Sequence, residues 1–195
     1  MHMSTTRLAA ALLFLCAVSV ATFLLPHGWD VAATVWVQRA APVLDVPATV
    51  FVYLGNAEVG IPAIVVVALL LWRRNRTRAR DALWLAAGML VVSVLAFMLK
   101  RVIPHPGPPL EFQRAVHRVG LNVPQPFSFP SGHAMRATFF ALTALRRTPA
   151  FGTALVIAMM AALVYLGDHW TSDVIGGLCL GWACAEAAAA VRARA

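Results

Sequence analysis

Apolar runs of nearly 20 residues constrain this chain more than any other feature of its sequence. The 195 residues are 61% hydrophobic and only 12% charged, and their mean hydropathy is +0.76. One soluble core of this size could not bury so much apolar surface. The runs approach the ~20 residues that a helix needs to cross a bilayer, and they lack the alternation of a membrane barrel. The sequence therefore predicts an all-α, polytopic membrane protein with a single domain over residues 1–195.

Six apolar runs predict a bundle of six transmembrane helices. The runs are Leu8–Leu25, Ala48–Trp72, Ala82–Leu99, Ser131–Leu145, Ala150–Leu166 and Asp173–Val191. The first run is longer than the apolar part of a signal peptide, and no small-x-small cleavage site follows it, which favours a helix. Two segments are too polar to span: an interfacial amphipathic segment over 27–47 and a proline-rich loop over 101–130.

The basic residues predict the orientation of this bundle. Ten of the 16 lysines and arginines lie at helix ends that the topology puts on one side, together with both termini. By the positive-inside rule this side is cytoplasmic. The other six are Arg39, Lys100, Arg101, Arg114, Arg118 and Arg136. Because five of these lie in or next to polar segments, we expect an anion site on the periplasmic or extracellular face of a bacterial inner membrane, and no nucleic-acid partner.

Three polar segments on that face carry residues suited to phosphate chemistry. The segment 128–133 opens an apolar helix with small residues, which leave backbone N–H groups accessible to an anion beside His133 as a proton donor. His169 and Asp173 are four residues apart, a helical spacing at which the carboxylate can hold one ring nitrogen and leave the other as nucleophile or base. A polar cap at the start of the last helix is the plainer alternative. Two histidines at one membrane level, with Lys100 and a helix N-terminus, predict a phosphate site that can also protonate a leaving group.

In order and spacing, these segments resemble the type 2 phosphatidic acid phosphatases, the lipid phosphatase branch of a superfamily that also contains vanadium haloperoxidases. The Pro-Ser-Gly-His run at 130–133 matches the family's second motif in full. His169 and Asp173 match the end of the third motif, and Lys100 and Pro108 match the two ends of the first. The resemblance extends over the last four predicted helices.

The resemblance implies a hydrolase that acts on a lipid phosphate or pyrophosphate without metal or other cofactor. His169, held by Asp173, would attack phosphorus to form a phosphohistidine. His133 would protonate the departing alkoxide, and water would then release phosphate. Charge on the phosphate oxygens would be neutralised by Lys100, Ser131 and the N–H of Gly132.

Both arginines with which this family binds phosphate are absent. Their positions fall on Gly107 and on the pair at 162–163, which is Ala-Leu. Their loss is expected to weaken phosphate binding, because a charge-assisted hydrogen bond contributes roughly 1.5–3 kcal/mol. The first candidate to compensate is Arg136, one helical turn from His133. The other candidates are Arg101, His105, Arg114 and Arg118. For His105 an ordinary loop role is the stronger alternative, and for Arg114 and Arg118 a solvated loop near anionic lipid is an equal one.

The substrate and two rival functions stay open. Prenyl phosphates, phosphatidate-like lipids and lipid-linked sugar phosphates all fit the resemblance, and the sequence does not give the oligomeric state. Without the arginines, the same fold could bind, transport or transfer a lipid phosphate instead of hydrolysing it. A metal-dependent hydrolase built on the two histidines is less favoured, because no pair has the spacing of a helix-borne zinc site. Cys16, Cys179 and Cys184 lie in apolar runs without paired spacing and predict neither a disulfide nor a zinc site.

Overall fold

The computed structural model describes residues 10, 14, 28–39, 42–114 and 125–193, and over these residues it is helical, with no strand. The all-α prediction is therefore confirmed for this part of the chain. The helices are α2 (Gly28–Val37), α3 (Asp45–Leu54), α4 (Ala57–Trp72), α5 (Arg76–Val102), α6 (Gly132–Ala144), α7 (Pro149–Tyr165) and α8 (Thr171–Arg192), with short 3-10 turns at Pro42–Leu44 and Leu110–Phe112. The predicted helix over 8–25 lies almost wholly outside the described residues.

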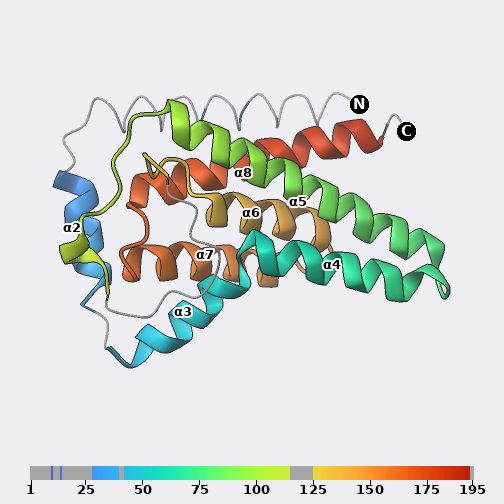
Figure 1. Ribbon diagram of the computed structural model, residues 1–195, viewed down its shortest axis with the longest axis horizontal. Helices are drawn as coiled ribbons and strands as arrows, with labels where there is room; N and C mark the ends of the chain where they lie inside the picture. Colours follow the sequence, from blue (N-terminus) through green and yellow to red (C-terminus); the bar gives the residue numbers. More distant parts are fainter. Residues whose placement is uncertain (1–9, 11–13, 15–27, 40–41, 115–124, 194–195) are drawn as a thin grey trace.

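Helix α6 is the central element of the bundle. It packs against α5, α7 and α8, and Figure 1 shows these helices side by side along the long axis of the molecule. Ser131 caps α6, because its side-chain oxygen accepts a hydrogen bond from the N–H of Ala134 at 3.4 Å. The N-terminus of α6, which carries the predicted phosphate motif, is thus surrounded by other helices.

Small residues allow α8 to approach α6 closely. A Cβ added at Gly177 would lie 2.5 Å from the main-chain oxygen of Ser131, and one at Gly181 would lie 2.5 Å from that of Met135. Both distances are too short for real atoms, so only glycine fits these two positions, which are one helical turn apart. This spacing of small residues is a common way for membrane helices to pack.

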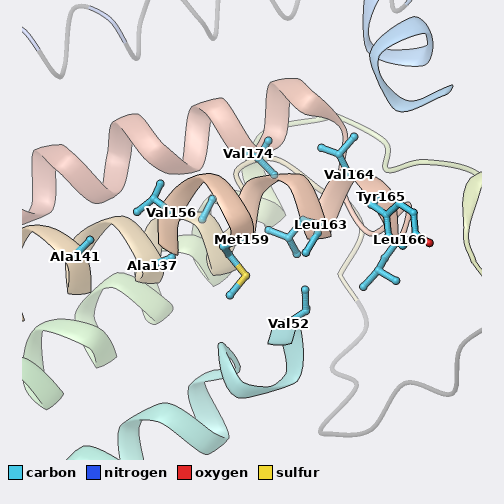
Figure 2. Packing of buried hydrophobic residues seen from close by; sticks show 12 residues of the cluster. Val52, Ala137, Ala141, Val156, Met159, Leu163, Val164, Tyr165, Leu166 and Val174 are labelled. Carbon is cyan, nitrogen blue, oxygen red and sulfur yellow. The ribbon is translucent and has the colours of Figure 1, made fainter. Parts of the chain in front are cut away.

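An apolar cluster joins α3, α6 and α7. Figure 2 shows Val52 of α3 pointing toward Met159 and Leu163 of α7, with Ala137 of α6 nearby. All four side chains are buried. This packing holds α3, which the sequence did not separate from α4, against the centre of the bundle.

The prediction of one continuous helix over 48–72 was wrong. The structure has two helices, α3 and α4, which bend by 55° at a break. Gly55 ends α3, and Asn56 is extended with φ −65° and ψ 144°. The main-chain oxygen of Asn56 accepts hydrogen bonds from N–H groups in the first turn of α4. Helix α3 also begins earlier, at Asp45, within the segment predicted as interfacial.

Six spanning helices are not confirmed. Among the described residues α5 and α8 are long and apolar enough to cross a membrane, and the bent pair Pro42–Leu54 and Ala57–Trp72 would make a third span. Helix α6 has 13 residues and α7 has 17, which at 1.5 Å per residue rise roughly 20 and 26 Å against a hydrocarbon core of about 30 Å. Helix α5 is longer than predicted and starts at Arg76, because the side chain of Asn75 accepts a hydrogen bond from Arg78 N and caps it.

Candidate active site

Three loop segments meet where α5 ends and α6 and α8 begin. The N–H of Ser128 donates to the main-chain oxygen of His105 at 2.8 Å, and the N–H of Ser131 donates to that of Asp173 at 3.0 Å. The indole N–H of Trp170 donates to the main-chain oxygen of Pro106 at 3.0 Å. These bonds join the loop after α5, the segment before α6 and the start of α8. The three polar segments singled out in the sequence are therefore brought together.

The turn between α7 and α8 depends on a glycine. Gly167 has φ +70°, and a Cβ there would collide with the main-chain carbonyl of Phe112. Only glycine therefore allows the loop after α5 to lie against this turn. A hydrogen bond from Arg114 N to the main-chain oxygen of Leu166, at 3.1 Å, holds the two segments together. The turn sets the position of His169, two residues further on.

His169 and Asp173 form the contact that their spacing predicts. The Nδ1 atom of His169 is 3.2 Å from Oδ2 of Asp173, and the N–H of Trp170 donates to the same oxygen at 3.0 Å. Both side chains of the pair are buried. Because the carboxylate faces Nδ1, that nitrogen carries the proton and Nε2 keeps its lone pair. Burial, and then the charge of Lys100, lower the pKa of His169 below its ordinary 6.5, against the opposing effect of Asp173, so the neutral ring is favoured.

His133 lies at the start of α6 with a partner from the helix break. Its Nε2 atom is 2.6 Å from Oδ1 of Asn56, and the amide of Asn56 in turn donates to Glu58 at 3.2 Å. The charge of a protonated His133 interacts with those of Arg136, His169 and Lys100. The two histidines of the predicted pair therefore belong to one cluster.

Two cations belong to this cluster and a third does not. The Nε atom of Arg136 donates to the main-chain oxygen of Gly55 at 3.0 Å, and its Nη1 lies only 3.2 Å from where a Cβ of Gly132 would be. The charge of Lys100 interacts with Asp173 and Arg136. Arg101 is exposed instead, and its guanidinium carbon is 4.4 Å from the centre of the Phe97 ring.

The candidates in the loop after α5 that could replace the motif arginines differ in their surroundings. His105 is only 1% exposed, and its Nδ1 is 3.1 Å from Oδ1 of Asp173. Arg114 pairs with Asp45 at 2.9 Å and donates to the main-chain oxygen of Gln38 at 2.6 Å, so it joins the loop to α2 and α3. Arg118 lies outside the described residues. Within the described part of the chain, no group of three or more His, Cys, Asp or Glu is arranged to hold a metal ion.

A match to a family model identifies the family of this chain. Residues 81–195 match the model of the PAP2 superfamily. The chain belongs to the PAP2 superfamily. The matched region begins within α5, five residues after its start, runs to residue 195 and contains all three polar segments.

Curated PAP2 relatives cover most of the chain. It is 32% identical over 159 residues to the decaprenylphosphoryl-5-phosphoribose phosphatase of Mycobacterium tuberculosis, a match that covers 80% of this chain and 86% of the relative. It is 29% identical over 156 residues to phosphatidylglycerophosphatase B of Bacillus subtilis, covering 72% of this chain and 71% of that protein. The predicted family and enzyme class are thus confirmed: the chain is a PAP2-type phosphatase and a membrane protein.

Solved structures confirm the PAP2 fold. The transmembrane PAP2-type phosphatidylglycerolphosphate phosphatase of Bacillus subtilis superposes with a TM-score of 0.77 at 21% identity, over 96% of each chain. LpxE of Aquifex aeolicus superposes with a TM-score of 0.61 at 23% identity, over 82% of this chain and 94% of that one.

The positions where PAP2 motifs carry arginine hold small or apolar residues here. Leu163 is 0% exposed in the core cluster and Ala162 lies beside it. A Cβ at Gly107 would lie 3.2 Å from Cβ of Ser128. The buried position of Leu163 has no room for a guanidinium without rearrangement, whereas at the exposed Gly107 a Cβ would require Ser128 to shift by only a few tenths of an ångström. Arg136 brings a guanidinium to the start of α6, with Nη1 3.2 Å from where a Cβ of Gly132 would be.

Sequence reasoning missed two contributors to the frame of the site. Asp30 of α2 is buried and accepts hydrogen bonds from N and Oγ of Ser172, at 2.9 and 2.7 Å, so it anchors the start of α8. Burial raises the pKa of Asp30 above its ordinary value, with the hydrogen bonds to Ser172 opposing. Asn56 at the helix break, whose Oδ1 is 2.6 Å from Nε2 of His133, is the second contributor. Its one sequence signal is the neighbouring glycine, which allows the helix to break there.

Proposed function

We propose that this PAP2 protein is a membrane lipid phosphatase that works through a phosphohistidine. The observation that carries the proposal is the buried pair of His169 and Asp173, in which the carboxylate holds Nδ1 and leaves Nε2 for attack. In the first step Nε2 forms a bond to phosphorus while the bond from phosphorus to the lipid oxygen breaks, and His133 gives that oxygen a proton. In the second step water attacks phosphorus, its proton passes to His133, and the P–N bond breaks to release phosphate.

The cations and the start of α6 are proposed to bind the phosphate oxygens. Lys100 and the Arg136 guanidinium supply positive charge, and the N–H of Gly132 and the hydroxyl of Ser131 lie at the helix N-terminus, where an anion is stabilised. Charge shifts onto these oxygens in the transition state, so the contacts accelerate the reaction as well as binding substrate. Arg136 takes the place of the absent motif arginines in this proposal.

The substrate is proposed to be a lipid phosphate monoester or diphosphate. Two of the relatives are a decaprenylphosphoryl-5-phosphoribose phosphatase and a phosphatidylglycerophosphatase, and both names indicate a phosphate joined to an apolar tail. Membrane helices around a polar site suit such a molecule, since the tail can remain in lipid.

The site is proposed to face the periplasm or the cell exterior in a bacterial inner membrane. Asp81, Arg146 and Arg192 line one cavity between the far ends of α5, α6 and α8, away from the start of α6 and its phosphate motif (Figure 1). The arginine-rich connection between α4 and α5 adjoins the same end. By the positive-inside rule this end is cytoplasmic, which leaves the histidines on the opposite side.

Phosphate release and covalent labelling together test the proposal. The purified protein in detergent is assayed with prenyl phosphate, phosphatidate and phosphatidylglycerol phosphate, each carrying ³²P in the terminal phosphate. We expect release from at least one lipid, an acid-labile and alkali-stable label on the protein, and loss of both by more than about a thousandfold in His169→Ala. Arg147→Gln, an exposed change at the other end of α6, serves as the control. Release that survives in His169→Ala would refute the phosphohistidine.

A non-hydrolytic function remains the second candidate because both motif arginines are absent. Binding, transport or phosphotransfer predicts tight association of the same lipids without phosphate release. Equilibrium binding of labelled lipid to the same preparation distinguishes it: saturable binding with no release on any lipid favours this candidate over hydrolysis.

A further inference from the structure

His105 lies against the carboxylate of the proposed catalytic pair. Its Nδ1 is 3.1 Å from Oδ1 of Asp173, while Nδ1 of His169 is 3.2 Å from Oδ2 of the same side chain. Each oxygen of Asp173 therefore faces one imidazole. We propose that His105 is a positioning residue that fixes the orientation of Asp173, and through it that of His169. The inference rests on the proposed function, because it assigns a role within the same reaction.

His105 is itself held rigidly by the segment before α6. Both N and Oγ of Ser128 donate to the main-chain oxygen of His105, at 2.8 and 3.0 Å. The ring packs edge-on against Phe129, with centroids 6.0 Å apart and planes at 61°. Only 1% of the residue is exposed. A substrate contact, as the sequence suggested, would require the ring to leave this packing, whereas a contact with Asp173 is already made.

The neighbours of Nδ1 determine which nitrogen of His105 carries a proton. The hydroxyl of Ser128 gives its proton to the His105 carbonyl, so its oxygen faces Nδ1 as an acceptor at 3.4 Å. The other neighbour of Nδ1 is a carboxylate oxygen of Asp173. Both of these neighbours are acceptors, which favours a proton on Nδ1. The ring thus places a protonated Nδ1 3.1 Å from the oxygen that His169 does not use.

A second close contact restricts rotation of the carboxylate. A carboxylate held through one oxygen can turn about its Cβ–Cγ bond and carry the bonded imidazole with it. Contacts on both oxygens stop this rotation, which keeps Nε2 of His169 aligned with phosphorus. Misplacement of a reacting group by about 1 Å can lower a rate about a hundredfold. The expected effect of losing His105 is therefore on kcat, with little change in KM.

Three variants test this role in kinetics. The probe is phosphatidate in detergent micelles. His105→Leu removes the donor, and we expect kcat to fall about 10- to 100-fold with KM within about threefold of wild type. His105→Asn keeps an amide N–H near the Nδ1 position and should restore kcat to within about threefold. Arg147→Gln, an exposed change at the other end of α6, is the control and should leave kcat within about twofold.

Two results of these kinetic measurements would contradict the positioning role of His105. A folded His105→Leu with kcat within about twofold of wild type, or equal losses in His105→Leu and His105→Asn, would overturn the proposal. Should His105→Leu not fold, His105→Gln takes its place, since its amide reaches the Nε2 position rather than Nδ1 and is expected to show the same loss.

A spectroscopic measurement separates this inference from the proposed function. ¹⁵N spectra of imidazole-labelled protein report whether each ring nitrogen is protonated, and the His105 signals are those that disappear in His105→Asn. We expect a protonated Nδ1, and an unprotonated one would overturn the inference. If the wild type released no phosphate from any lipid, the proposed function would fail, and the spectrum would still decide whether the Nδ1 that faces Asp173 is protonated.

Discussion

Replacement of Arg136 by glutamine gives the most direct measure of how this protein manages without the motif arginines. The guanidinium donates through Nε to the main-chain oxygen of Gly55 at 3.0 Å, which fixes its plane, and its Nη1 lies beside Gly132 at the start of α6. Glutamine removes the charge and is too short to keep both positions. Losing one charge-assisted hydrogen bond to phosphate costs about 1.5–3 kcal/mol, and at 1.36 kcal/mol per factor of ten kcat/KM should fall about 10- to 150-fold.

The assay compares three variants for phosphate release from the best lipid substrate in detergent. Arg136→Lys keeps the charge but loses the Nε contact with Gly55, so an intermediate loss is expected. Arg147→Gln removes an exposed arginine at the other end of α6 and should leave kcat/KM within about twofold. Thermal unfolding of each variant shows whether the fold is intact. If folded Arg136→Gln kept kcat/KM within about threefold of wild type, Arg136 would not bind the phosphate and the reasoning would fail.

Three further predictions concern the other parts of the site and its frame. Because burial lowers the pKa of His169, the neutral nucleophile persists to lower pH, and the acidic limb of kcat/KM should have its midpoint below 6.5; a midpoint above 6.5 in a pH–rate profile would contradict the assignment. Gly181→Ala forces a Cβ to 2.5 Å from a main-chain oxygen of α6 and should lower stability by about 1–3 kcal/mol in thermal unfolding, whereas Gly60→Ala, whose Cβ meets nothing closer than 4.0 Å, should not destabilise. Asn56→Ala removes the 2.6 Å contact with His133 and should lower kcat about 3- to 10-fold, and an unchanged kcat would show that this contact does not position His133.

The sequence was most informative where local spacing determines the contact. The four-residue interval between His169 and Asp173 predicted their hydrogen bond, because a helical turn brings such residues together. The boundaries of α7 and α8 were likewise predicted to within about two residues, since apolar runs end at polar junctions.

Contacts between distant segments could not be read from the sequence. The approach of His105 to Asp173 spans 68 positions and depends on how a proline-rich loop folds back, for which no periodic pattern exists. The bend at Gly55 has only a weak local signal, the Gly-Asn pair at 55–56 within a longer apolar stretch, and this pair does not give the bend of 55°. Asp30 gave no signal either, since one acidic residue in an amphipathic segment normally faces water.

The frame of the site is joined largely through main-chain atoms. The bonds from Ser128 to His105 and from Ser131 to Asp173 use amide hydrogens and carbonyl oxygens, which every amino acid except proline provides in full. Side chains at these positions can therefore be exchanged during evolution without undoing the architecture. Such a scaffold tolerates wide sequence divergence in its loops. Single substitutions in the site can then change its activity while the fold is kept.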